Sequence, residues 1–187
     1  MSTTACSYFY FVMLFTGILI THKSQSQPRN IFKVNLLSPA FRSVSIAGEH
    51  LLNPDQSLQI GFFYTGIRQQ EISYQGFGLT PEYRFYLDKF EAPAGFFIST
   101  FLRHHNLKMT NSEKSEKARL LTYGGGISIG GQWVFDYKFA FTLEIYGGLA
   151  YDLPHLILKE GAKRLSFDTG LYSGFNPRFG LTMGWAF

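Results

Sequence analysis

Long stretches of this chain alternate a bulky apolar residue with a small or polar one, and this period of two restricts the possible folds severely. In the last stretch, bulky residues occupy every second position from Phe179 to Phe187, and Gly180, Thr182 and Gly184 lie between them. Such alternation indicates β-strands with two unlike faces. The pattern occurs in eight stretches, separated by turn-rich segments: 31–39, 43–52, 57–66, 76–87, 95–107, 119–135, 138–151 and 176–187. We therefore predict an all-β chain of eight antiparallel strands.

The bulky faces of these strands are too large for the inside of a closed eight-stranded sheet. Such a barrel has an interior only just wide enough for side chains, but the five clearest strands offer more than twenty large apolar residues. The small and polar residues fit the interior, so the apolar face must point outward. An apolar band around a whole molecule promotes aggregation in water, whereas lipid requires such a surface. The pattern thus predicts an up-and-down transmembrane β-barrel.

The connections and the aromatic residues predict which end of the barrel is which. Turns are short at 53–55, 88–94 and 136–137, whereas 67–75, 108–118 and 152–175 look like long polar loops. Outer-membrane barrels have short periplasmic turns, longer extracellular loops and two interfacial girdles of aromatic residues. We expect the following girdles: Trp133, Phe135, Tyr137, Phe139, Trp185 and Phe187 on the periplasmic side, and Tyr64, Phe77, Tyr123, Tyr151 and Phe179 on the outer side.

The first 26 residues look like a secretory signal peptide. Residues 8–20 form an apolar block, and Ser24-Gln25-Ser26 offers small residues at the positions required for cleavage after Ser26. No apolar run reaches the roughly 18 residues of a membrane-spanning helix. The single cysteine, Cys6, precedes the block, so the mature chain contains no disulfide. We expect a signal peptide at 1–26, a barrel at 27–187, and localisation in the cell outer membrane of Gram-negative bacteria.

Seven charged residues fall on the inward face by alternation, and the last five are the expected charge network: Lys33, Glu49, Glu82, Arg84, Arg103, Glu144 and Arg178. An isolated buried charge costs several kcal/mol, so these side chains should pair across the lumen. We expect Glu82 and Glu144 to meet the three arginines and to form a plug. The alternative is a gated ion path in which the pairs exchange partners.

Signals for catalysis or ligand chemistry are weak in this sequence. Ser99 and His105 lie on one strand face, as a lipid A acyl-modifying enzyme of the outer membrane would use, but about 20 Å apart along the strand. The histidines have no metal-ligand spacing, and Gly124–Gly130 lacks the pattern of a phosphate-binding loop. The net charge of +4 is scattered, which disfavours nucleic-acid binding. We expect no catalytic residue, cofactor or metal.

Several segments resemble an uncharacterised family of outer-membrane barrels, the domain of unknown function numbered 3575, which is common in Bacteroidetes-type bacteria. They are VNLLSPAF (34–41), GFGLTPEYRFYL (76–87), GFFISTFLR (95–103), GGGISIGGQWVF (124–135) and PRFGLTMGWAF (177–187). The resemblance spans about 31–187. It implies an eight-stranded outer-membrane barrel of unassigned activity, without catalytic residues.

The end of the chain is similar to the signal by which the barrel-assembly machinery recognises its clients. Alternating apolar residues end at Phe187, and we expect Trp185 and Phe187 to carry this signal. Expected partners are therefore outer-membrane lipids and the assembly machinery, with unknown partners at the extracellular loops.

The sequence as a whole favours a small, plugged outer-membrane barrel with a structural or surface-interaction role. Two alternatives remain open at this point: a lipid-modifying enzyme of the outer membrane, and a soluble lipocalin-like carrier whose apolar face lines a cavity.

Overall fold

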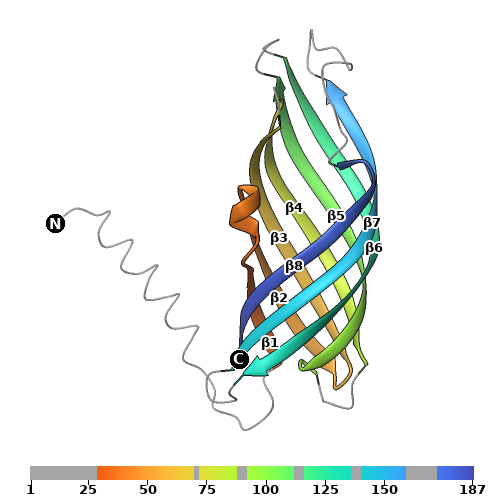
Figure 1. Cartoon of the computed structure of the whole chain (residues 1–187). Coiled ribbons are helices and arrows are strands. Elements are labelled where there is room, and N and C mark those ends of the chain that lie inside the picture. The colour runs from red at the N-terminus through yellow and green to blue at the C-terminus, as the bar shows by residue number, and fades with distance from the viewer. Residues whose placement is uncertain (1–28, 70–71, 88–91, 112–115, 136–139, 159–171) are drawn as a thin grey trace, which may run out of the picture.

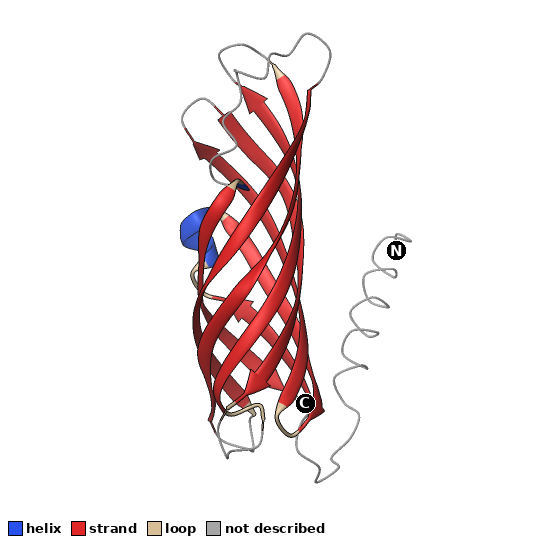
Figure 2. Cartoon of the chain, turned by 90° about the vertical axis from the view of Figure 1, so that its right-hand side faces the viewer, coloured by secondary structure: helices blue, strands red, loops and turns tan. Residues whose placement is uncertain are grey.

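Eight antiparallel strands close into a barrel in the computed structural model, which describes residues 29–69, 72–87, 92–111, 116–135, 140–158 and 172–187 (Figures 1 and 2). The elements are β1 (Asn30–Asn35), η1 (Ser38–Phe41, a 3-10 helix), β2 (Ser43–Asn53), β3 (Gln56–Gln69), β4 (Ile72–Tyr86), β5 (Gly95–Asn111), β6 (Lys117–Phe135), β7 (Phe141–Leu158) and β8 (Gly174–Ala186). The predicted fold class, all-β and up-and-down, is confirmed. The expected signal peptide lies outside the described residues. Within the described ranges, no helix is long and apolar enough to cross a membrane.

Each strand pairs with its sequence neighbours, and β1 pairs with β8 to close the ring. At the end of this ladder, two backbone hydrogen bonds join Asn30 to Phe187, from Asn30 N to Phe187 O at 3.1 Å and from Phe187 N to Asn30 O at 2.8 Å. Both residues lie at the end of the barrel that carries the short β2–β3 turn. We call this end the terminal end, and the opposite end, where β5 meets β6, the extended end.

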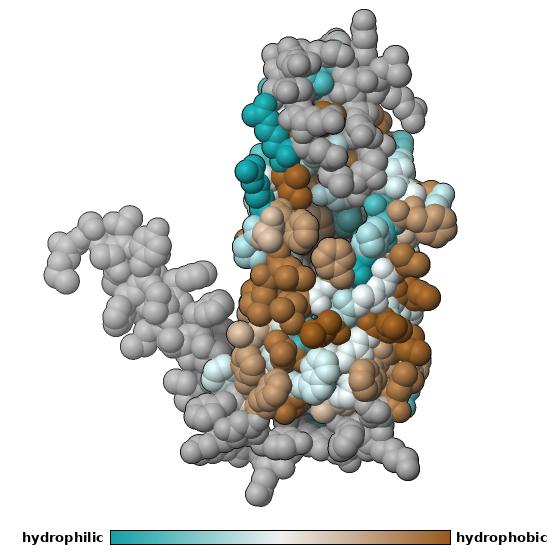
Figure 3. Space-filling model, in the orientation of Figure 1, coloured by the Kyte–Doolittle hydropathy of each residue, from teal (hydrophilic) through white to brown (hydrophobic). Residues whose placement is uncertain are grey.

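The apolar faces point outward, as the alternation predicts. Ile129 and Met183 are exposed. Ser128 and Thr142, each of which lies between two apolar residues in the sequence, are buried. On β5, Phe96, Ile98 and Leu102 are also exposed, and this places Arg103 inside. Figure 3 shows hydrophobic side chains over the lower and middle part of one face of the barrel and hydrophilic ones toward the extended end.

Three expected loops are shorter than predicted, because the strands are longer at the extended end than the loop signals indicate. Strands β3 and β4 continue through most of 67–75, β5 and β6 enter 108–118 from both sides, and β7 continues to Leu158. The first strand is shorter than expected, since β1 ends at Asn35 and the chain turns into η1. Pro39 lies in η1 and has no N–H with which to continue a ladder.

At the extended end, strands β3 to β6 reverse their polarity. Their inward side chains form an apolar cluster, the upper cluster, made of Tyr74, Leu107, Met109, Ala118 and Leu120. Their outward side chains include the exposed polar residues Arg68, Gln75, Lys108, Lys117 and Arg119. The strands are paired here as they are below, with Leu107 opposite Leu120. The period of two therefore continues to the end of these strands, while the apolar side changes from outside to inside on β3 to β6. On β7, Leu153 and Ile157 remain exposed on the outer face.

Gly126 allows close contact between β6 and β7, and its replacement tests this packing. A Cβ at Gly126 would meet the carbonyl oxygen of Leu149, whereas a Cβ at Gly147, on the outer face, would meet no atom within 4 Å. We expect Gly126→Ala to lower the unfolding free energy by about 1–3 kcal/mol and Gly147→Ala to leave it unchanged or raise it by about 0.5 kcal/mol. Urea unfolding of the two variants checks this, and equal shifts would contradict the register.

Candidate functional site

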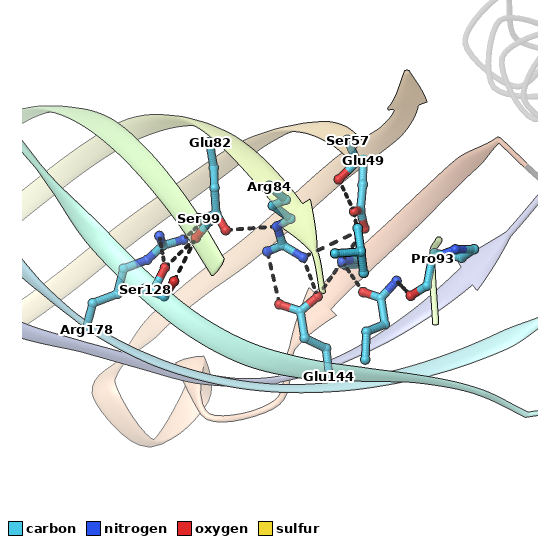
Figure 4. Close-up of polar contacts among 12 residues, drawn as sticks. Glu49, Ser57, Glu82, Arg84, Pro93, Ser99, Ser128, Glu144 and Arg178 are labelled. Carbon is cyan, nitrogen blue, oxygen red and sulfur yellow. Dashed lines mark hydrogen bonds and ion pairs between the residues drawn. The ribbon is translucent and has the colours of Figure 1, made fainter. Parts of the chain in front are cut away.

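Arg84 is the centre of a buried charge layer in the barrel interior (Figure 4). Its side chain is 0% exposed and is held from β4 toward the opposite wall. Arg84 Nε donates to Glu82 Oε1 at 2.8 Å, and the two Nη atoms donate to Glu144 at 2.8 and 3.1 Å. Such two-pronged arginine–carboxylate pairs combine charge with fixed geometry. Arg84 therefore ties β4 to β7 across the lumen.

Lys33 of β1 is the second buried cation of this layer. Its Nζ lies 2.5 Å from Glu49 Oε2 and also contacts Glu144, so it shares that carboxylate with Arg84. Glu49 Oε1 accepts hydrogen bonds from Ser57 at 2.5 Å and from Tyr86 at 2.6 Å. These bonds replace the water that the charges have lost, which a buried ion pair requires.

Arg178 extends the layer toward the extended end. Its Nη2 lies 2.6 Å from Glu82 Oε2, and its guanidinium carbon lies 4.2 Å from the centre of the Phe101 ring. The Arg84 guanidinium lies in the same way over Phe97, at 4.4 Å. Aromatic faces attract cations and exclude water. The two inward phenylalanines of β5 therefore fill the lumen and stabilise its cations.

Arg103 forms a separate ion pair, nearer the extended end. Its Nε donates to Asp152 Oδ1 at 2.7 Å, its Nη2 contacts Oδ2 of the same carboxylate, and Asn176 Nδ2 donates to Oδ2 at 2.8 Å. The structure thus joins Glu82, Arg84, Glu144 and Arg178, but it places Arg103 with a residue that we had expected to lie in a loop. The signal for Asp152 was its phase, since it continues the inward positions of β7 after Ala150.

Apolar clusters close the lumen on both sides of the charge layer. Toward the terminal end, Leu51, Tyr86, Ala92 and Phe97 pack together. Toward the extended end lies the upper cluster, with Tyr172 packed against it. Burial raises the pKa of Tyr172 to about 12, so its hydroxyl stays neutral at physiological pH. The side chains of the charged and apolar layers therefore fill the described part of the barrel axis, where an open channel would otherwise run.

The serine and histidines of the enzyme alternative do not form a triad among the described residues. Ser99 Oγ lies 2.7 Å from Ser128 Oγ, within the charge layer. His105 points inward against Phe63, with ring centres 4.8 Å apart, whereas His104 lies against Tyr123. Over the same described residues, no group of three or more His, Cys, Asp or Glu side chains could hold a metal ion.

The two residues expected to carry the assembly signal lie on the outer face at the terminal end. Trp185 faces Phe32 of β1 and Phe141 of β7 across the two ladders, and Phe187 follows the end of β8. Both side chains are exposed. Trp133 and Phe135 are exposed at the same end of β6, whereas Tyr137 and Phe139 lie outside the described residues.

The comparisons with known proteins place the chain in a family without giving it an activity. No curated protein and no solved structure shows significant similarity to it. A family model described as "Protein of unknown function (DUF3575)" matches residues 9–161, a range that includes β1 to β7 and stops before β8. The resemblance of 177–187 therefore lies beyond the matched range. Since the match covers most of the 187 residues, the chain belongs to the DUF3575 family of proteins of unknown function.

Proposed function

We propose that this protein is a small outer-membrane β-barrel with a lumen plugged by side chains, and that it has a structural or surface-interaction role. The observation that carries the proposal is the reversal of polarity along the strands. Below the reversal the outside is apolar and the inside charged, as a lipid environment requires. Above it, on β3 to β6, the inside is apolar and the outside basic and polar, as in a water-soluble protein.

The height of the apolar part supports the same proposal. Tyr123 and Trp133 are exposed on the outer face of β6 at its two borders. The ten residue steps from one position to the other, at about 3.3 Å each and tilted by about 40°, rise about 25 Å. The apolar band of outer-membrane barrels has this height, with aromatic residues at both borders. Outer-membrane lipids are therefore the partners proposed for this surface.

The structural or surface-interaction role follows from what the lumen lacks and what the extended end offers. The charge layer leaves no continuous channel among the described residues, so we expect no steady conductance in planar bilayers. The extended end would stand outside the membrane with Arg68, Lys108, Lys117 and Arg119 on its surface. We further propose that Trp185 and Phe187 carry the contact with the barrel-assembly machinery.

Neither alternative has a comparable observation in its favour. A lipocalin-like carrier needs the large apolar face around an internal cavity, but Ile127, Ile129 and Leu149 are exposed on the outside. A lipid-modifying enzyme needs a nucleophile with a base at hydrogen-bond distance. Ser99 instead bonds to Ser128.

Cysteine labelling on intact cells tests the proposed topology. In a Cys6→Ser background, Lys108→Cys places a thiol on the outer face of the extended end, and Asp55→Cys places one in the β2–β3 turn at the terminal end. A membrane-impermeant maleimide applied to intact cells should label the first variant and not the second. Permeabilising the outer membrane should expose the second.

Two measurements accompany the labelling. The folded chain should be extracted only by detergent, and its electrophoretic mobility should change on heating. Equal labelling of both cysteines in intact cells, or recovery of the chain in the soluble fraction, would overturn the membrane location. A steady, ohmic conductance would overturn the plug and leave the location intact.

A further inference from the structure

The barrel wall has a gap where β1 ends early. The β1–β8 ladder stops at Asn35 opposite Thr182, although β8 begins at Gly174, and the β1–β2 ladder stops at Val34 opposite Ile46. Leu36 N still donates to Leu181 O at 2.8 Å, but residues 37–41 do not continue the sheet. They include η1, which projects from the outside of the wall in both views (Figures 1 and 2). Phe41 of η1 contacts Phe179 of β8, with ring centres 6.0 Å apart. A short non-strand segment, residues 37–41, therefore covers this part of the wall; we call it the strap.

A cavity of about 330 Å³ lies behind this strap and joins the lumen to the outer face. Its inner lining includes Gln59, His105 and Thr182, and its outer lining includes Phe41, Phe62 and Phe179. On the face that carries η1 and β8, hydrophilic atoms are visible between hydrophobic side chains (Figure 3). The volume is at the lower end of that of small-molecule sites, which suits one polar head with the start of a single chain.

Three polar side chains in this cavity each bury one atom that has no hydrogen-bond partner among the described residues. Gln59 and His105 are each 5% exposed and Thr182 is 7% exposed. The three atoms are Gln59 Oε1, His105 Nδ1 and Thr182 Oγ1. Leaving such atoms unsatisfied costs about 1–3 kcal/mol each, and native proteins rarely tolerate it. Three of them around one cavity indicate a ligand that donates and accepts hydrogen bonds.

The charges around the cavity favour an uncharged ligand head. Its cations are already paired: Lys33 with Glu49 and Glu144, Arg103 with Asp152, and Arg178 with Glu82. With Arg84 included, the described lumen contains four paired cations and four carboxylates. A charged head would bring an unmatched charge into this layer, which is costly at low dielectric constant. Hydroxyl, amide or protonated carboxyl groups match the free atoms without that cost.

The only way out of the cavity that the described residues leave open is sideways. The Arg84 charge layer closes it toward the terminal end. Toward the extended end, Tyr172 contacts His105 at 5.4 Å and Tyr74 of the upper cluster at 5.7 Å, measured between ring centres. An occupant of the cavity therefore continues through the wall, past Phe41, Phe62 and Phe179. These exposed aromatic side chains suit an apolar chain.

We propose that this cavity binds a single-chain amphiphile that enters from the bilayer. Its uncharged, hydrogen-bonding head lies against Gln59, His105 and Thr182, and its apolar chain passes under η1 to the outer face. The route of the chain rests on the proposed membrane location, whereas the polar head site rests on the cavity itself.

Photolabelling tests the proposal with the full chain in phosphatidylcholine vesicles. The probe is a 1-hexadecanol analogue with a diazirine close to its hydroxyl group, and the cross-linked residues are identified by mass spectrometry. We expect labels on inward residues of the cavity, such as Thr80 and Tyr146, and we expect an excess of 1-hexadecanol to compete them away. Labels on the general outer face should not be competed. A doubly charged alkyl phosphate should compete much less well than the alcohol.

Matched glycine variants test the position of the site. Gly61 faces the cavity, and a Cβ there makes only ordinary contacts with Thr80, at 3.6 and 3.7 Å. Gly61→Leu should fill the cavity and abolish inward labelling. Gly48→Leu, on the outer face with no atom within 4 Å of the new Cβ, should leave it unchanged.

A third variant separates binding from stability. Thr182→Val keeps the shape but removes the free hydroxyl, so it should weaken competition by about tenfold without lowering the unfolding midpoint, because that hydroxyl has no partner to lose. Labels confined to the outer face, or equal inward labelling of Gly61→Leu and Gly48→Leu, would overturn the proposal. Detergent extraction and heat-dependent mobility of the same samples show independently whether the membrane location holds.

Discussion

Arg84→Ala should destabilise the barrel by about 3–5 kcal/mol, the usual effect of removing one partner from a buried ion pair. Arg84 is fully buried, and its guanidinium contacts Glu82 and Glu144 directly. Its loss would leave Lys33 and Arg178 to balance Glu49, Glu82 and Glu144. One buried carboxylate would then have no cation, and no other described cation in the layer could replace it.

The measurement is urea unfolding of the full chain in vesicles, followed by the fluorescence of Trp133 and Trp185. Both side chains lie on the outer face and change environment on unfolding. Arg84→Met combined with Glu144→Gln is the control, because it removes a positive and a negative charge together. The double variant should recover much of the lost stability, since neutral replacements of buried pairs are often well tolerated. An Arg84→Ala protein as stable as the wild type would show that the buried ion pairs of Arg84 do not stabilise the barrel.

Ile129→Arg should cost about 2–4 kcal/mol if the outer face meets hydrocarbon, because this is the effect of an arginine near the middle of a bilayer. Ile129 is 65% exposed and lies midway between the aromatic residues Tyr123 and Phe135 on β6. In water an arginine at so exposed a position would change stability by no more than about 0.5 kcal/mol. The same urea titration therefore reports the medium around the barrel.

Ile157→Arg is the matched control for this substitution. Ile157 is 42% exposed on the outer face of β7, but it lies at the extended end, opposite Arg119 of β6. We expect a change of less than about 1 kcal/mol, including some repulsion from Arg119. Equal effects of the two substitutions would mean that no boundary between lipid and water separates these positions.

The number, direction and facing of the strands could be predicted from the sequence because side chains alternate along every strand. The ends of the strands could not. Segment 108–118 is rich in polar and charged residues, which indicates a loop, yet Met109 and Ala118 still alternate with outward polar residues. The alternation continues in this segment, but the apolar side chains point inward instead of outward. A strand assignment that requires the apolar residues to stay on the outer face therefore ends these strands too early.

The members of the charge layer could likewise be identified from phase alone, but their partners could not. Glu82, Arg84, Glu144 and Arg178 are drawn from β4, β7 and β8. Which of them meet depends on strand tilt and on side-chain length across the lumen. Arg103 is an example. It lies on the inward face, as expected, but its partner is Asp152, another inward residue, and not Glu82 or Glu144.

Alternation along a strand is a local property, set by the backbone, so the sequence by itself determined that eight strands close with small and charged residues inside. Distances across the lumen, the gap above Asn35 and the cavity behind η1 arise from how separate strands are placed around a ring. Only the tertiary structure decided them, because no local pattern encodes which residues of different strands share a height.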